Sequence, residues 1–255
     1  MMQNTEFPLP THLPFELVAL EKAVRYQQWI IDTIQPYLGK RILELGAGIG
    51  NMSRWFKTAE RLVLTETDPE LLQCLEARAN VWFPNSQSVS VRSLDIAKET
   101  LHLFVEDNID TIVSFNVLEH IEDHQAVLQQ CVNLLRQSSP GKKTIITFVP
   151  AHAFAYGVMD KEVGHFRRYN KKMFQELHQQ IIPDAKLILQ PFNFIGLLGW
   201  IMNGRVLQKN SAGSNVIGIF ETLCPLIKYI DTIVIKKMKI PLGQSLLAIQ
   251  EFSTT

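Results

Sequence analysis

The stretch RILELGAGIGN, from Arg41 to Asn51, decides the fold that we expect for this chain. It opens with a short apolar run, RILEL, and Gly46, Gly48 and Gly50 follow directly. Glycine adopts positive φ values without steric cost and lets the backbone come close to a ligand. A buried strand that turns through glycines into a helix, which the sequence MSRWF would begin, indicates a site for a nucleotide-like ligand. The spacing G-x-G-x-G differs from the G-x-G-x-x-G of dinucleotide-binding enzymes.

The composition favours one large globular domain or a domain with an elaborate insertion, since the chain has 255 residues and 46% of them are hydrophobic. Lys and Arg number 25, as do Asp and Glu, so no overall field attracts nucleic acid, and we expect no DNA partner. The N-terminal sequence MMQNTEFPLP lacks the basic and apolar parts of a signal peptide. No apolar run reaches the roughly 18 residues that a transmembrane segment needs. With three scattered cysteines, these features predict a reduced, cytoplasmic protein.

Strand-like and helix-like patterns alternate through the chain. After the glycine turn, strands are expected at residues 61–65, 88–94, 110–115, 144–149, 185–190 and 245–252. The pattern predicts an α/β fold with a seven-stranded, mostly parallel, doubly wound (Rossmann-like) sheet and a helical insertion between the last two strands. We therefore divide the chain into a core with an N-terminal helical segment (1–191), a helical lid insertion (192–244) and the final strand of the sheet (245–255).

Acidic residues end the second and third predicted strands. Glu66 lies about 20 residues beyond Gly46, where nucleotide-binding folds of this kind place a carboxylate for the ribose hydroxyls. The alternative makes Glu66 an ordinary strand-end charge, while Asp68 caps the next helix. Asp95 ends the third strand. It could bind a ligand there or simply cap the turn that follows.

The glycine spacing resembles motif I of the class I S-adenosylmethionine-dependent methyltransferases. In that family an acid at the position of Asp95 accepts a hydrogen bond from the adenine amino group. The sequence VLEHI after the fourth strand resembles the ubiquinone-biosynthesis O-methyltransferases, and it lacks the Asn/Asp-Pro-Pro-aromatic motif of the enzymes that methylate nucleic-acid amino groups. The resemblance implies S-adenosylmethionine as the cofactor. It assigns cofactor binding to Glu44, Gly46, Ala47, Gly48, Gly50, Glu66, Asp95, Ile96, Asn116, Val117 and Leu118.

The segment GHFRRY, together with VLEHI, resembles a group of bacterial class I methyltransferases that act on small molecules. Arg167, Arg168 and Tyr169 could clamp a carboxylate or phosphate of the acceptor. In the alternative, one arginine pairs with Asp160 or Glu162 and the other faces solvent.

Methyl transfer needs a base only when the acceptor is a hydroxyl or a protonated amine, and His120 and His165 are the candidates. Some related enzymes bind a divalent metal with the Glu-His of this motif, an earlier Glu and a later His. Glu119, His120 and His165 could match, but Asn116 stands where the earlier acid would be. We therefore predict that no metal is bound.

The long insertion has two apolar helical stripes, and Pro225 should kink or restart the second. We interpret it as a lid over the acceptor pocket, with a cap or dimer interface and a peripheral membrane contact as alternatives. The predicted function is methyl transfer from S-adenosylmethionine to an oxygen or nitrogen of a small-molecule acceptor, which could be anionic or linked to a lipid or sugar. The alternatives are a cofactor-binding regulatory module without catalysis and a small-RNA end methyltransferase.

Overall fold

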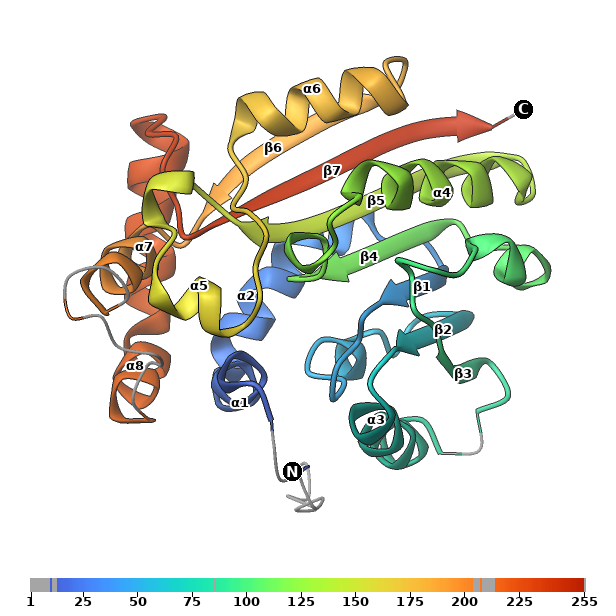
Figure 1. Ribbon diagram of the computed structural model, residues 1–255, viewed down its shortest axis with the longest axis horizontal. Helices are drawn as coiled ribbons and strands as arrows, with labels where there is room; N and C mark the ends of the chain where they lie inside the picture. Colours follow the sequence, from blue (N-terminus) through green and yellow to red (C-terminus); the bar gives the residue numbers. More distant parts are fainter. Residues whose placement is uncertain (1–9, 11–12, 85, 204–206, 208–213, 255) are drawn as a thin grey trace.

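A single sheet of seven strands runs through the centre of the computed structural model, which describes residues 10, 13–84, 86–203, 207 and 214–254 (Figure 1). The strand order is β3-β2-β1-β4-β5-β7-β6, in which β7 runs antiparallel to both of its neighbours. This order confirms the mostly parallel, doubly wound class predicted from the sequence. The strands are β1 (Arg41–Leu45), β2 (Arg61–Glu66), β3 (Val89–Ser93), β4 (Thr111–Phe115), β5 (Gly141–Pro150), β6 (Lys186–Phe192) and β7 (Ser245–Thr254).

Helices cover both faces of the sheet because successive side chains of each strand point to opposite faces. Leu43 of β1 packs in the core beneath α4 and α6, whereas its neighbour Ile42 packs in the core beneath α2, α3 and α8. The α-helices are α1 (Phe15–Lys22), α2 (Val24–Ile34), α3 (Pro69–Trp82), α4 (His124–Gln137), α5 (Val158–Glu162), α6 (Lys171–Ile181), α7 (Phe194–Ile201) and α8 (Ser214–Asp231). The helices α5, α7 and α8 gather at the end of the sheet where β4 and β5 finish (Figure 1).

The segment after the glycine turn differs from the prediction. Instead of an α-helix beginning at MSRWF, it forms only a short 3-10 turn, η2 (Ser53–Trp55). Ser53 is buried and donates a hydrogen bond of 2.6 Å from its hydroxyl to Glu44. Phe56 is buried too, and the chain must still reach the start of β2. These two inward-facing side chains pull the segment against the sheet before a longer helix can form.

The insertion is helical, as expected, but Pro225 does not restart its second helix. One helix, α8, continues through Pro225 and passes into a π-helical turn, η7 (Thr232–Lys237). Pro225 lies inside this helix at an exposed position, where its missing N–H removes one backbone hydrogen bond without ending the helix. Despite the intervening helices, β6 and β7 pair as antiparallel neighbours from Lys186 with Glu251 to Phe192 with Ser245. The predicted division of the chain at 192 therefore falls on the last residue of β6, and the lid boundaries stay a prediction.

Polar contacts fasten the insertion to the core. The carboxylate of Asp231 accepts hydrogen bonds from the backbone N–H groups of Asn193 (2.6 Å) and Phe194 (2.7 Å), which begin α7. Lys228 of α8 pairs with Asp32 of α2 at 2.9 Å. The start of α7 and the end of α8 are thus joined to each other and to α2.

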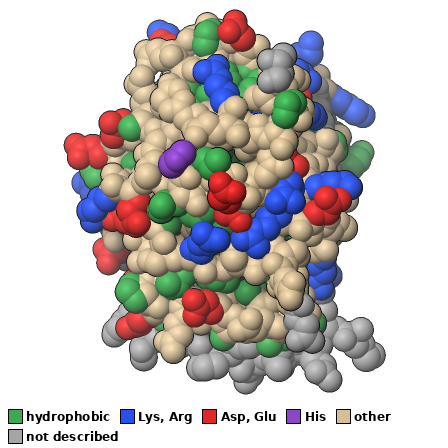
Figure 2. Space-filling view, turned by 90° about the vertical axis from the view of Figure 1, so that its right-hand side faces the viewer, with side chains coloured by type: hydrophobic (Ala, Val, Ile, Leu, Met, Phe, Trp, Pro, Cys, Tyr) green, Lys and Arg blue, Asp and Glu red, His purple; other side chains and the backbone are tan. Residues whose placement is uncertain are grey.

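The face at the amino ends of the parallel strands carries acidic and basic side chains intermixed (Figure 2). Ion pairs such as Lys40–Glu60 and Arg61–Asp107 join strand starts and nearby loops. All three cysteines are buried and unpaired. Among the described residues, no helix has the length and apolar character needed to cross a membrane.

Candidate active site

The glycine turn lies at the carboxyl end of β1. Gly46, Gly48 and Gly50 all have positive φ, at 61°, 58° and 81°. A Cβ at Gly46 would come within 2.7 Å of Val117, which follows β4, so the two strand ends approach closely here. A side chain at Gly46 would therefore be both strained and crowded, which explains the glycine.

Glu66, at the end of β2, is tied to this turn. Its Oε2 accepts from the N–H of Gly48 at 2.8 Å, and its Oε1 accepts from the N–H groups of Thr67 (2.8 Å) and Asp68 (3.0 Å). An ionised carboxylate has about four acceptor positions, so one remains for a ligand hydroxyl. Asp68 also caps α3, accepting from the N–H groups of Glu70 and Leu71, as predicted.

The other predicted cofactor residues differ in how they face the cleft. Glu44 is 2% exposed beneath the turn, and burial raises the pKa of its carboxyl to about 8. Asp95 accepts from the N–H of Ala97 at 3.1 Å, so it caps the turn after β3, as the alternative proposed. Asn116 directly follows β4 and has a φ of 52°. Its backbone N–H donates a hydrogen bond to the carbonyl of Phe148. The remaining predicted residues lie in the glycine turn, after β3 and after β4: Ala47, Ile96 and Leu118 are buried and Val117 is half-buried.

Helix α1 lies over the glycine turn, which the sequence did not predict. The side chain of Leu17 stands 3.0 Å from the position that a Cβ on Gly48 would take. Asn51 donates a hydrogen bond of 3.0 Å to the carbonyl of Leu17, and Arg78 pairs with Glu21 at 3.0 Å. No residue of α1 is fully buried. Helix α1 is therefore held over the glycine turn by a few contacts and has no buried face of its own.

The predicted anion clamp does not form, because its three side chains point to different partners. Arg168 pairs with Asp160 at 2.7 Å, which is the alternative considered from the sequence. Arg167 donates to backbone carbonyls of Ile121 and Glu122. Tyr169 is fully buried, hydrogen-bonded to His124 and to the carbonyl of Leu118. Adjacent side chains of an extended segment leave in opposite directions, so of these three residues only Arg168 lines the site.

His165 is held in a defined orientation by Asp160. Its Nδ1 lies 2.8 Å from Asp160 Oδ1, and because a carboxylate only accepts, the imidazole carries its proton there. The opposite nitrogen, Nε2, is buried without a hydrogen-bond partner in the described structure. It lies 3.8 Å from Glu16 Oε1 and 3.9 Å from Glu119 Oε1. The unpartnered Nε2 of His165 therefore faces two carboxyl groups.

His120 completes this acid–histidine cluster, which we define as Glu16, Glu119, His120 and His165. The rings of His120 and His165 lie 4.7 Å apart. Ligand atoms of Glu16, His120 and His165 all lie within 4.8 Å of one another, the geometry of a cation site. Glu119 is fully buried, and neither of its carboxylate oxygens has a hydrogen-bond partner among the other described residues. The sequence placed Glu119, His120 and His165 in one group, but it gave no signal for Glu16, which comes from a distant helix.

The electrostatics of the cluster follow from burial. Loss of water raises the pKa of Glu119 well above its ordinary value, and burial also raises that of Glu16 against the opposing effect of His165. Partial burial and the neighbouring His165 lower the pKa of His120 to about 4, although some of its surface remains in solvent. Burial opposes ionisation of Asp160, yet hydrogen bonds from His165 and Arg168 keep its pKa below the usual range. The cluster thus has a neutral imidazole and carboxyl groups that gain from a proton or a cation.

A chamber of about 390 Å³ opens beside the cluster. Glu16, His165 and Arg168 form part of its wall, Asn116 joins it to the end of β4, and α7 and α8 close it on the other side. Trp200 of α7 stacks on Arg168, with the guanidinium 4.6 Å from the ring centre. The sequence missed Trp200 as a site residue because its spacing alone does not distinguish a chamber wall from a packing face.

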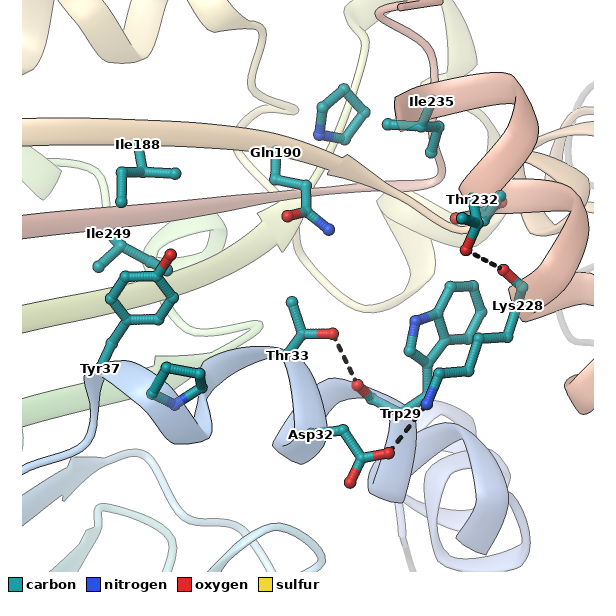
Figure 3. Close-up of a pocket in the computed structure, with 13 residues that line it drawn as sticks. Trp29, Asp32, Thr33, Tyr37, Ile188, Gln190, Lys228, Thr232, Ile235 and Ile249 are labelled. Carbon is teal, nitrogen blue, oxygen red and sulfur yellow. Dashed lines mark hydrogen bonds and ion pairs between the residues drawn. The ribbon is translucent and has the colours of Figure 1, made fainter. Parts of the chain in front are cut away.

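A second cavity of about 400 Å³ lies between α2, β6 and the end of α8 (Figure 3). Several of its polar side chains are already engaged with one another or with backbone. Asp32 pairs with Lys228, and Thr33 and Thr232 donate to the carbonyls of the residues four before them. No predicted site residue lines it, so we place the candidate site at the chamber.

Comparison with known proteins agrees with this geometry. Residues 43–139, which run from β1 to the end of α4, match a family described as a methyltransferase domain. This part of the chain is similar to methyltransferase domains. The methyltransferase-like region contains the glycine turn, Glu66, Asp95 and the VLEHI segment, whereas GHFRRY and the insertion lie beyond it.

Solved structures show the same fold for the methyltransferase-like region and its surroundings. An S-adenosylmethionine-dependent methyltransferase from Mesorhizobium loti superposes with a TM-score of 0.57 at 14% identity, covering 91% of this chain and all of that one. Magnesium protoporphyrin IX methyltransferase from Synechocystis, solved with bound SAH, gives 0.53 at 9% identity, covering 96% of this chain and 90% of that one. The fold is therefore a class I methyltransferase fold.

A protein of uncharacterised function from Mycobacterium tuberculosis is 32% identical over 99 residues. The match covers 38% of this chain and 34% of the relative, so the chain spans about a third of the length of that curated relative.

Proposed function

We propose that this protein is an enzyme that transfers the methyl group of S-adenosylmethionine to an oxygen or nitrogen of a small-molecule acceptor. One observation carries the proposal: a three-glycine turn bonded through Gly48 to Glu66, within a methyltransferase-like region, at the strand edge where the chamber also opens. Ligands of open α/β sheets bind at this edge.

The residues of the turn fit the cofactor. Gly46 and Gly48 carry no side chains of their own, although Leu17 of α1 lies over Gly48, and Glu66 has an acceptor position left for a ribose hydroxyl. Asp95 is already engaged, since one carboxylate oxygen caps its turn and the other pairs with Lys98 at 2.8 Å, so an adenine amino group would have to share or replace the lysine. The cofactor supplies an electrophilic methyl group on a sulfonium, so alignment with the acceptor accounts for much of the rate.

His165 is the candidate base for a hydroxyl acceptor. The acceptor oxygen would form its bond to the methyl carbon as its proton passes to Nε2 of His165, and the carbon–sulfur electron pair stays with sulfur. Asp160 holds the tautomer that leaves Nε2 free and stabilises the imidazolium that results. His120, neutral at pH 7, is close enough to take part.

Binding of the cofactor tests the proposal directly. Gly48→Arg should abolish the binding of S-adenosylmethionine in calorimetric titration, because a side chain at this positive φ would strain the turn and press against Leu17. Gly141→Arg is the matched control, since Gly141 also has a positive φ but has no neighbour within 4 Å of an added Cβ. Equal affinity in the two variants would reject the assignment.

A divalent cation is the second candidate for how the cluster activates the acceptor. The orphaned oxygens of Glu119 and the convergence of Glu16, His120 and His165 favour it, and Glu16 would supply the acid that the sequence lacks at Asn116. The fixed Nδ1–H of His165 is also the arrangement that metal-ligating histidines use.

Removal of metal separates the two activation modes. If His165 acts as the base, dialysis against EDTA leaves methyl transfer unchanged; if a cation acts, activity falls and added Zn²⁺ or Mn²⁺ restores it. In both cases His165→Gln should lower kcat by about 10²-fold or more. His102→Gln is the control and should leave kcat unchanged, because His102 is exposed and does not belong to the acid–histidine cluster. Full kcat in His165→Gln would contradict both modes.

A further inference from the structure

The second cavity, of about 400 Å³, is not used by the proposed function. Its floor is the face of the sheet at the β6 edge, where Ile188 of β6 pairs directly with Ile249 of β7 across the strands. Gln190 stands on the same face of β6, two residues further along, because alternate side chains of a strand share a face. The paired isoleucines give a flat apolar floor, which suits the face of a planar ring.

Two separate segments of the chain form the walls beside this floor. One is the carboxyl half of α2 with the residues that follow it, and the other is the end of α8 with the π-helical turn η7. In Figure 3, Thr33 of α2 and Thr232 of η7 stand on the two sides of the space into which Gln190 points. Turns of the π type are rare and frequently occur at functional sites. The volume is sufficient for a ligand with two fused rings.

The cavity contains hydrogen-bonding groups that the described chain leaves unpaired. The amide of Gln190, the indole N–H of Trp29 and the hydroxyl of Tyr37 have no hydrogen-bond partner among the described residues. Figure 3 shows the amide and the indole nitrogen directed toward the same space. The amide of Gln190 presents a donor beside an acceptor, the complement of the N–H and C=O of another amide. A purely hydrocarbon ligand would bury these groups without partners, which opposes its binding.

The charged groups of the cavity are already engaged. Lys228 pairs with Asp32 at 2.9 Å. Both carboxylate oxygens of Asp231 accept from backbone N–H groups, those of Asn193 and Phe194. Among the described lining residues, an anionic ligand therefore meets no unpaired cation, and a cationic ligand meets no unpaired carboxylate.

We infer that this cavity is a second ligand site, separate from the glycine turn and the chamber, that binds an uncharged planar heterocycle containing a cyclic amide. The ring lies on Ile188 and Ile249, its N–H and C=O pair with the amide of Gln190, and the indole N–H of Trp29 supplies a further donor. Binding here does not depend on methyl transfer, since no residue of the glycine turn or of the acid–histidine cluster lines the cavity.

Two compounds with the same ring system test the amide recognition. Quinolin-2-one carries the N–H beside its C=O, whereas 1-methylquinolin-2-one lacks it. Each is titrated by calorimetry into the full chain. Quinolin-2-one should bind about tenfold more tightly, because methylation leaves the amide oxygen of Gln190 without a partner.

The indole N–H resonances in NMR spectra locate the bound compound. Trp29 lines the cavity, Trp82 lies beside the glycine turn at Gly50, and Trp200 lines the chamber. Titration with quinolin-2-one should shift the resonance of Trp29 and leave those of Trp82 and Trp200 in place.

A variant of the floor tests the role of Gln190. Gln190→Met keeps the length of the side chain and removes its amide. It should weaken quinolin-2-one about tenfold and bind 1-methylquinolin-2-one as the wild type does. Gln73→Met is the matched control, because Gln73 is exposed on α3 and lies outside the cavity. Both variants should keep the wild-type Tm, since neither glutamine side chain has a hydrogen-bond partner among the described residues.

Any of four results would overturn the inference: no binding of either compound, equal affinity of the wild type for both, equal loss of both compounds in Gln190→Met, or shifts at Trp82 or Trp200 without one at Trp29. The last result would assign the compound to the glycine turn or to the chamber. Failure of the proposed function is distinguishable, because it would appear as absent S-adenosylmethionine binding while these titrations stay unchanged.

Discussion

At the scale of single residues, the site depends on buried carboxyl groups that have different tasks. Glu66 is satisfied by three backbone N–H groups, whereas Glu119 has no partner on the other described residues. A carboxylate held by backbone N–H groups can orient a ligand hydroxyl, while an orphaned buried one costs free energy unless a proton or cation joins it. This difference matches the proposed division of the site into a cofactor side and an acceptor side.

The buried carboxyl of Glu44 makes stability depend on pH. Its pKa is about 8 in the folded protein, against 4.5 for the free side chain, so the folded state keeps a proton that the unfolded state releases. The free energy of unfolding should therefore fall as pH rises from 4.5 to 8, by up to about 1.4 kcal/mol per pH unit from this group. Glu44→Gln should remove that part of the slope in urea titrations across this range.

Glu76→Gln is the control for this titration, because Glu76 is exposed on α3 and should leave the slope of the wild type intact. A constant stability difference between the wild type and Glu44→Gln over the whole range would contradict the assignment of a raised pKa.

At the scale of elements, α1 connects the two halves of the site. Leu17 covers the glycine turn, while the neighbouring Glu16 faces His165 in the chamber. One helix without a fully buried residue thus contacts both the cofactor turn and the acceptor cluster. A ligand at the glycine turn that displaces α1 would therefore also move Glu16 at the acid–histidine cluster. A ligand at the cluster that displaces α1 would likewise move Leu17 at the turn.

Leu17 should limit the entry of the cofactor, because a ligand resting on the turn competes with its side chain. Truncation in Leu17→Ala weakens the closed position and raises the fraction of open molecules, so S-adenosylhomocysteine should associate about threefold to tenfold faster in stopped-flow fluorescence. Val18→Ala, on the same helix, is the control and should associate at the wild-type rate. Association of Leu17→Ala that is no faster than that of the wild type would show that α1 does not gate the turn.

At the scale of the whole molecule, β7 integrates the insertion with the core. It pairs with β5 from Ser245 to Thr254 and with β6 on its other side, so the chain must return from α8 to the middle of the sheet. Asp231 and the pair Lys228–Asp32 add contacts between the insertion and its base.

The insertion should therefore unfold together with the core. Unfolding in urea, followed by far-UV circular dichroism and by tryptophan fluorescence, should give one coincident transition, because removal of α8 leaves the apolar face of α2 uncovered. A separate early fluorescence transition, absent from a Trp200→Phe variant, would show that the insertion folds as an independent unit.

Local signals in the sequence predict the sheet and the strand-end turn at which we propose that the cofactor binds. Apolar runs of strand length, a glycine turn and strand-end acids are local signals, and parallel strands bring their carboxyl ends to one edge whatever the rest of the chain does. The strand assignments accordingly hold to within a few residues, while the helix expected at MSRWF failed because Ser53 and Phe56 turn inward.

The proposed acceptor side depends on contacts that the sequence does not reveal. Glu16 enters the cluster from α1, Arg168 is neutralised by Asp160, and α8 supplies an apolar wall to a chamber that begins at Asn116. These relations join segments far apart in the chain, and nothing in their local spacing specifies which face meets which. Packing decides which partner a side chain meets, whereas local sequence decides its backbone preference. The two arginines that suggested an anion clamp therefore bind Asp160 and backbone carbonyls in the folded protein.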